Sequence, residues 1–191
     1  NGAHKEITSA QQLSQSVNVT SLDGSATGTI TVNFLGSNDI ASLSSATASV
    51  TETNSAASLS ASGKLIVTDP DLGESFVQQQ TTSGTYGTFA VDINGNWTFV
   101  GNGAHDELTA GQVVSQSATV LSKDGSASGT ITVNITGTND AATVTSSTKS
   151  VSEGDLASNL NTSGSVTVTD PDTGESHTRA ATSSGTYGTF S

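Results

Sequence analysis

Short runs in which apolar and polar residues alternate are the main pattern along this chain. Ile131, Val133 and Ile135, for example, alternate with Thr132 and Asn134. Because successive side chains of a strand point to opposite faces, this alternation predicts a β-strand with one buried and one solvated face. The pattern predicts seven strands in the middle of the chain, at residues 43–52, 63–68, 75–80, 86–93, 96–100, 113–121 and 126–136. The fold class predicted is therefore all-β.

Turn residues separate these runs. Asn94-Gly95 lies between two alternating segments, which predicts a hairpin whose two central residues both take positive φ. Asp23-Gly24 and Asp124-Gly125 are interpreted as plain hairpin turns. Residues 106–112 are predicted to form a short helical turn at a corner. Seven short strands with such turns favour an immunoglobulin-like or cadherin-like β-sandwich.

The few aromatic residues concentrate in the predicted strands. Tyr86, Phe89, Trp97 and Phe99 are predicted to anchor the core. A sugar-stacking role for Trp97 is the alternative, but a sole Trp in a small sandwich is more often a core residue. Only 4% of the residues are aromatic, which argues against a ligand-binding module with clustered exposed aromatics.

The chain also repeats itself at a separation of 101 residues. Residues 1–90 align with residues 102–191 without a gap, and 51 of the 90 pairs are identical. A period of this length predicts tandem domains: a complete repeat at 40–140, the C-terminal part of a preceding repeat at 1–39, and the N-terminal part of a following repeat at 141–191. Either partial repeat alone would expose an apolar face and strand edges. We therefore expect neighbouring repeats of a longer array, or other copies in a head-to-tail filament, as partners.

Charge and composition exclude several functions. The formal net charge is −12, which disfavours binding to nucleic acid and to anionic lipid, and there is no cysteine for thiol catalysis or Cys-based metal sites. No apolar run approaches the length of a membrane span, so direct membrane insertion of this segment is not expected. His4 and His105 match each other in the two copies, but Lys5 follows the first and Asp106 the second, and His177 replaces Phe76, so the copies share no catalytic arrangement of histidine. No nucleophile elbow, phosphate loop or zinc motif is present. We therefore do not expect an enzyme.

An ordered set of short motifs resembles the VCBS repeat of large RTX-type bacterial surface adhesins. The motifs, three of which recur unchanged at the 101-residue separation, are Val50-Thr51-Glu52, Val67-Thr68-Asp69-Pro70-Asp71, Gly84-Thr85-Tyr86-Gly87-Thr88-Phe89, Asn94-Gly95-Asn96-Trp97-Thr98-Phe99, Asp124-Gly125 and Gly137-Thr138-Asn139-Asp140. The resemblance implies cadherin-like sandwich extenders, calcium at domain junctions, an extracellular location at the cell surface or in secreted form, and a role in attachment or biofilm. The glycine-rich calcium nonapeptide of such adhesins does not occur here.

Acidic residues gather where the predicted repeats meet, which makes Ca²⁺ the leading candidate ligand. Asp69 and Asp71 are predicted to point the same way on an extended segment, and Gly73 to turn Glu74 towards them. Glu52, Asn38 and Asp39 are candidates to complete the shell, in the manner of cadherin linkers. The matching set is Asn139, Asp140, Glu153, Asp170, Asp172 and Glu175. The alternative is that Asp-Pro-Asp-x-Gly-Glu is a solvated acidic turn without a metal.

Three functions are compatible with these observations. The first is a calcium-stiffened structural extender or adhesion repeat. The second is a carbohydrate-binding or other ligand-binding module of a secreted protein. The third is a self-assembling filament subunit. Repeats that are nearly identical favour the first.

Overall fold

The computed structural model describes residues 4–55, 59–156 and 160–191. The first three residues of the Asn-Gly-Ala-His sequence that recurs at 102–105 lie outside the described residues. The described part is nearly all β, as predicted. Its strands are β1 (Gln12–Thr20), β2 (Thr27–Leu35), β3 (Ser42–Leu43), β4 (Ala46–Thr51), β5 (Ser60–Lys64), β6 (Val67–Thr68), β7 (Gln80–Ser83), β8 (Gly87–Val91), β9 (Asn96–Gly101), β10 (Val113–Leu121), β11 (Ser128–Thr136), β12 (Thr143–Val144), β13 (Val168–Thr169), β14 (Ser183–Gly185) and β15 (Gly188–Phe190).

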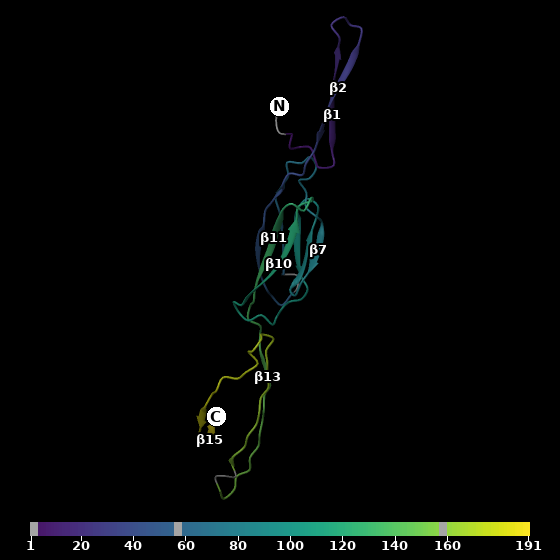
Figure 1. Ribbon diagram of the computed structural model, residues 1–191. Helices are drawn as coiled ribbons and strands as arrows, with labels where there is room; N and C mark the ends of the chain where they lie inside the picture. The colour runs from purple at the N-terminus through teal and green to yellow at the C-terminus, as the bar shows by residue number, and fades with distance from the viewer. Residues whose placement is uncertain (1–3, 56–58, 157–159) are drawn as a thin grey trace.

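Two sheets in the middle of the chain form a sandwich-like arrangement. One has the strand order β5-β9-β8-β7 and is antiparallel, and the other has the order β10-β11-β4. In the second sheet β4 runs parallel to β11, while β10 and β11 form an antiparallel hairpin. The small β3–β6 pair adds to this central body, which runs from blue through teal to green in Figure 1.

Alternating side chains of both sheets meet in a single core. Phe89 of β8 and Phe99 of β9 lie with their ring centroids 4.9 Å apart. Ile131 and Ile135 of β11 are fully buried in the same cluster. The predicted core aromatics are confirmed: Phe89, Trp97 and Phe99 are buried, and Tyr86 is half-buried against the cluster. Because the indole of Trp97 is buried, it offers no exposed face for stacking on a sugar.

Three predicted strands differ from the structure. The segment 43–52 is divided between β3, which pairs with β6, and β4, which pairs with β11. The segment 63–68 is divided between β5 and β6, and β5 begins earlier, at Ser60. In the segment 75–80, Val77 makes only an isolated bridge to Ser122, and the neighbouring strand β7 begins at Gln80. The last two differences arise because long-range pairing with β9 and β8, rather than local alternation, determines where β5 and β7 lie.

The turns also differ in detail from the prediction. At Asn94-Gly95 only Gly95 takes positive φ, at 79°. The Gly95 N–H donates to Asp92 O, so Ile93 and Asn94 are the central residues of a turn that Gly95 follows as a bulge. The predicted helical turn at 106–112 consists of two successive turns, closed by Leu108 N–H to His105 O and by Gln112 N–H to Thr109 O.

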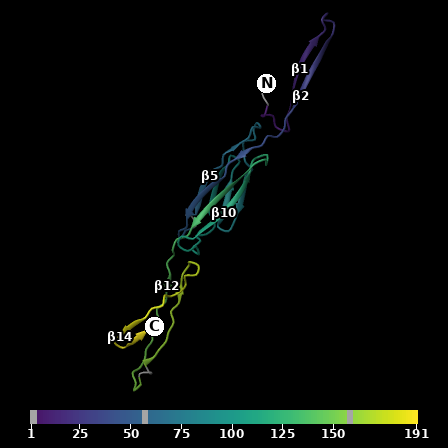
Figure 2. The same ribbon diagram turned by 60° about the vertical axis from the view of Figure 1, so that its left-hand side comes forward.

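Segments on either side of the sandwich extend the molecule in opposite directions. The β1–β2 hairpin projects from one end, and the chain from residue 141 onwards lies beyond the other (Figures 1 and 2). Val17 and Ile30 of the hairpin are 57% and 54% exposed. In the described part of the chain, no helix is long and apolar enough to cross a membrane.

Candidate metal centre

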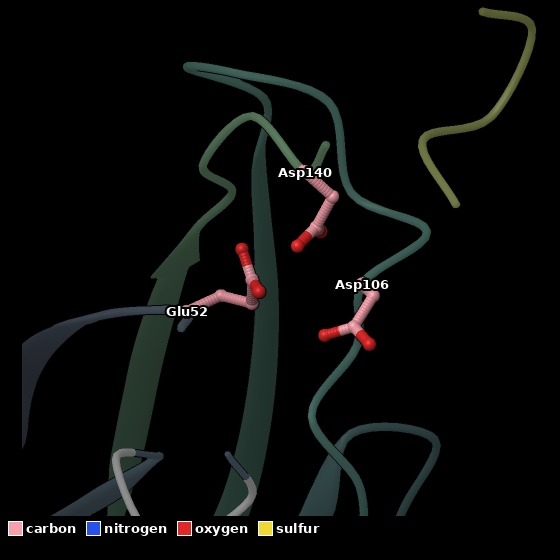
Figure 3. Close-up of side chains that lie close together, drawn as sticks. All are labelled: Glu52, Asp106 and Asp140. Atoms are coloured by element: carbon pink, nitrogen blue, oxygen red, sulfur yellow. The ribbon is translucent and has the colours of Figure 1, made fainter. Parts of the chain in front are cut away.

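Three carboxylates converge at the end of the sandwich nearest the C-terminal segment. Glu52 directly follows β4, and Asp140 follows β11 after a short loop. Because β4 and β11 are parallel, with Thr51 opposite Thr136, their carboxyl ends meet at the same edge of the sheet. Asp106, in the loop after β9, completes the group, and the three side chains point towards one another in Figure 3. One carboxylate oxygen from each lies within 4.8 Å of the other two.

Glu52 and Asp140 are each anchored through one oxygen and leave the other unpaired. Glu52 Oε2 accepts hydrogen bonds from Thr138 N–H at 2.8 Å and Thr138 Oγ1 at 2.9 Å. Asp140 Oδ1 accepts a hydrogen bond from Asn54 Nδ2. The second oxygens, Glu52 Oε1 and Asp140 Oδ2, are buried and without a hydrogen-bond partner among the described residues, as is Asp106 Oδ1. Glu52 is 0% and Asp140 4% exposed.

This arrangement is electrostatically unfavourable without a cation. Two carboxylate charges 4.8 Å apart repel by roughly 3 kcal/mol at an effective dielectric constant of about 20. Within the described ranges, no lysine, arginine or histidine forms an ion pair with Glu52, Asp106 or Asp140. Carboxylate oxygens held in this way are the ligands that Ca²⁺ takes in proteins, so the residues fit a hard divalent cation.

A fourth carboxylate comes from beyond the sandwich. The Asp140 N–H donates to Asp172 Oδ2 at 2.9 Å, and Asp172 is 2% exposed. Its other oxygen, Asp172 Oδ1, is buried and lacks a hydrogen-bond partner in the part of the chain that the structure describes. The Thr173 N–H donates to Glu107 O at 3.2 Å. We call these contacts, together with the Glu52–Asp106–Asp140 group, the second junction.

The same contacts occur 101 residues earlier, and we call them the first junction. The Asp39 N–H donates to Asp71 Oδ2 at 2.9 Å, and the Leu72 N–H donates to Glu6 O at 3.2 Å. Asp71 is 1% exposed, and its Oδ1 is buried without a hydrogen-bond partner within the described residues. The two junctions therefore share their backbone contacts and one buried aspartate each.

The two aspartates of the Asp-Pro-Asp motif, Asp69 and Asp71, belong to different acidic sites. The prediction that Asp69 and Asp71 lie on one extended segment and point the same way is wrong. Strand β6 ends at Thr68, and Asp69 Oδ1 accepts a hydrogen bond from the Asp71 N–H at 2.9 Å. Asp71 faces the first junction, while Asp69 lies in a second acidic group with Glu74 and Asp124. Gly73 has φ of 78°, and Glu74 does turn back to Asp69. All three members of this second group are only half-buried.

The sequence predicts that Asp124 is a plain turn residue, and it does cap the β10–β11 turn, accepting hydrogen bonds from Ser122 Oγ and the Ser126 N–H. Burial opposes its ionisation, but hydrogen bonds from Ser122, Ser126 and Asn38 outweigh burial and hold the pKa of Asp124 well below its ordinary value. Its Oδ2 accepts the bond from Asn38 Nδ2 at 3.0 Å. Asp124 thus belongs both to a turn and to an acidic group.

The remaining candidates lie around these groups. Asn38 and Asn139 each donate from Nδ2 to the carbonyl oxygen of the following aspartate, so these amides brace the connecting segments. Glu153 and Glu175 are exposed, and Asp170 Oδ1 accepts a hydrogen bond from the Asp172 N–H at 3.0 Å. Sequence reasoning missed Asp106, because the matching residue of the other copy is Lys5 and the comparison of copies selected shared acidic positions. The neighbouring acidic pair Asp106-Glu107 was the available signal.

The His105 side chain contributes to the loop that carries Asp106. Its Nδ1 lies 2.9 Å from Glu107 Oε1, and His105 itself has positive φ. This hydrogen bond is the main cause that lowers the pKa of Glu107.

A comparison of the chain with protein-family models and a comparison with curated proteins both give no match.

Proposed function

We propose that this chain is an extender segment of a large extracellular adhesion protein, stiffened by calcium where its repeats meet. In this proposal the sandwich at 40–140 is one of a series of immunoglobulin-like or cadherin-like repeats with a period of 101 residues. The segments 1–39 and 141–191 belong to the neighbouring repeats. The protein acts by spanning distance at a cell surface, in attachment, biofilm or filament formation, rather than by catalysis.

The observation that carries the proposal is the unpaired buried oxygens of Glu52, Asp106 and Asp140, directed at one point. Asp172 is joined to Asp140 there, although it lies in the following segment. A cation held at that point would fix Asp140, whose N–H bonds to Asp172 of the following segment, and so would restrict the angle between the two sides of the junction. The contacts matched at the first junction, 101 residues earlier, support a structural unit that recurs. The ordered motifs that resemble VCBS repeats support the same interpretation.

The proposal is tested by calorimetric melting of the 191-residue chain in calcium and in EDTA. Free calcium at about a hundredfold above its dissociation constant, which is about 10⁻⁴–10⁻³ M for extracellular modules, adds roughly 2.7 kcal/mol. For a domain of about a hundred residues, that free energy raises the melting temperature by roughly 10–20 °C.

Two variants make this test specific. Glu52→Gln combined with Asp140→Asn keeps the side-chain size and removes two of the converging charges, so we expect most of the calcium shift to disappear. Asp23→Asn, in the exposed β1–β2 turn, is the matched control and should keep the full shift. Identical melting of the unmodified chain in calcium and in EDTA would contradict the proposal.

A further inference from the structure

The two junctions share their backbone contacts, but their side chains differ. Glu52 of the second junction has no counterpart 101 residues earlier in this sequence, and the loop residue that matches Asp106 carries the opposite charge. Lys5 occupies the position that Asp106 occupies 101 residues later, between two residues that are the same in both copies. Both loops have the same local conformation: His4 and His105 have φ of 50° and 64°. Each of these histidines places Nδ1 2.9 Å from the Oε1 of the glutamate two residues on. The exchange of Asp for Lys therefore occurs on an unchanged backbone.

At the first junction the lysine lies beside the aspartate that corresponds to Asp140. Lys5 Nζ is 3.9 Å from Asp39 Oδ1, and the Asp39 side chain is 28% exposed. At the second junction, by contrast, Asp140 is 4% exposed and its Oδ2 is buried without a partner among the described residues. The first junction thus has the positive charge of Lys5 at the position where the second junction has the carboxylate of Asp106.

This exchange changes the charge available to a bound cation. At the second junction Asp106, Asp140 and Asp172 are all acidic, whereas at the first junction Lys5 offsets one of the two matching aspartates. Affinity for Ca²⁺ follows the number and charge of the carboxylate ligands, and a nearby ammonium repels the ion. The lysine also supplies, from the chain itself, part of the positive charge that an ion would bring.

We propose that Lys5 acts as a tethered cation that makes the first junction independent of calcium, whereas the second junction depends on it. This inference rests on the proposed function, because it assigns different regulation to two forms of the same junction. Withdrawal of calcium would then loosen the chain at one junction and leave the other closed. The Lys or Asp at this loop position determines which response a junction has.

Amide hydrogen exchange tests the inference at single bonds. The Asp39 and Leu72 amides donate across the first junction, and the Asp140 and Thr173 amides donate across the second. With calcium at about ten times its dissociation constant, transfer to EDTA should reduce protection of the second pair about tenfold. Protection of the first pair should stay the same within about twofold.

Three variants test the role of the lysine itself. Lys5→Gln should lower protection of the Asp39 and Leu72 amides equally in calcium and in EDTA. Asp106→Lys should make the second junction resemble the first, with Asp140 and Thr173 protected in both buffers. Asp106→Asn, the matched control, should lose the calcium response without gaining protection in EDTA. Lys5 is 64% exposed at its side chain, so its replacement does not threaten folding.

The outcomes separate this inference from the proposed function. If the Asp39 and Leu72 amides lose protection in EDTA as much as the second pair does, the tethered-cation role is overturned and calcium binding stands. If Lys5→Gln leaves the first pair unchanged, the role of Lys5 is likewise overturned. If the second pair does not respond to calcium in the unmodified chain, the proposed function and this inference both fail.

Discussion

The β1–β2 and β10–β11 hairpins have closely related sequences and the same register, but only one has a buried face. Val17 pairs with Ile30 in the first, and Ala118 with Ile131 in the second. The polar faces match too: Ser16 bonds to Thr31 at 2.9 Å, and Ser117 to Thr132 at 3.0 Å. The opposite, apolar faces of the two hairpins differ in exposure: Val17 and Ile30 are exposed, whereas Ala118 and Ile131 are buried.

What differs is the presence of covering elements. Ile131 is 0% exposed because β4 pairs with β11, and because side chains of β8 and β9 pack in the same core. Ile30, at the matching position, is 54% exposed. The pairing and the turn are therefore local properties that both segments have, whereas burial requires partners from elsewhere in the chain. Matched substitutions in the two hairpins isolate that second contribution.

The largest difference is expected for truncation of the matched isoleucines. Ile131→Ala removes buried methyl groups from a packed core and should lower the free energy of unfolding by about 2–5 kcal/mol. Ile30→Ala should change it by no more than about 0.5 kcal/mol, because its side chain is mainly solvated. Urea unfolding followed by fluorescence of the buried Trp97 measures both. Equal costs at the two positions would mean that the exposed face of β1–β2 is covered in solution.

A smaller difference is expected for the matched glycines at the start of β2 and β11. A Cβ on Gly129 would collide with the backbone oxygen of Ser44, whereas one on Gly28 would meet nothing within 4 Å. Gly129→Ala should therefore cost about 1–3 kcal/mol, since backbone must shift. Gly28→Ala should be neutral or stabilise by up to about 1 kcal/mol through the unfolded chain. The same urea titrations measure both, and a neutral Gly129→Ala would contradict the close approach of residues 42–44 to β11.

Local alternation was sufficient to predict the strands that carry the core. The predictions at 96–100 and 113–121 match β9 and β10 to within one residue. The predictions at 63–68 and 75–80 did not succeed, because β5 and β7 contain mainly small or polar residues. Those strands exist because β9 and β8 offer them hydrogen-bonding edges, which a local pattern does not encode.

The acidic residues likewise fall into some that the sequence identified and others that only the structure shows. The sequence identified Glu52, Asp140 and Asp172 as candidates, and the structure puts Glu52 and Asp140 in one group and Asp172 next to Asp140. It did not identify Asp106, which reaches the group through the loop after β9, and it did not separate Asp69 from Asp71. Both points depend on how loops fold back on the sheet edge.

The smallest effect is expected at the aspartates of the two matched turns. Asp23 accepts hydrogen bonds from Ser21 and Ser25, which lower its pKa to about 2. The pKa of Asp124 is also lowered, because bonds from Ser122, Ser126 and Asn38 outweigh burial. For both groups the folded-state pKa lies below the unfolded value of about 3.9. Their contribution to stability is therefore present above about pH 4 and is lost as the pH falls through the folded-state values.

Only Asp124, in the turn of the buried β10–β11 hairpin, should affect the stability of the core. Asp124→Ala removes a turn cap that also bonds to Asn38, so it should lower the free energy of unfolding at pH 7 by about 0.5–1.5 kcal/mol. It should also flatten the decline of that free energy below about pH 4, because the titrating group is absent. Asp23→Ala should leave the Trp97-detected unfolding unchanged at every pH, since its turn lies in the exposed β1–β2 hairpin. An equal response to Asp23→Ala would show that the two hairpins unfold together, and the contrast between them would then be one of exposure alone.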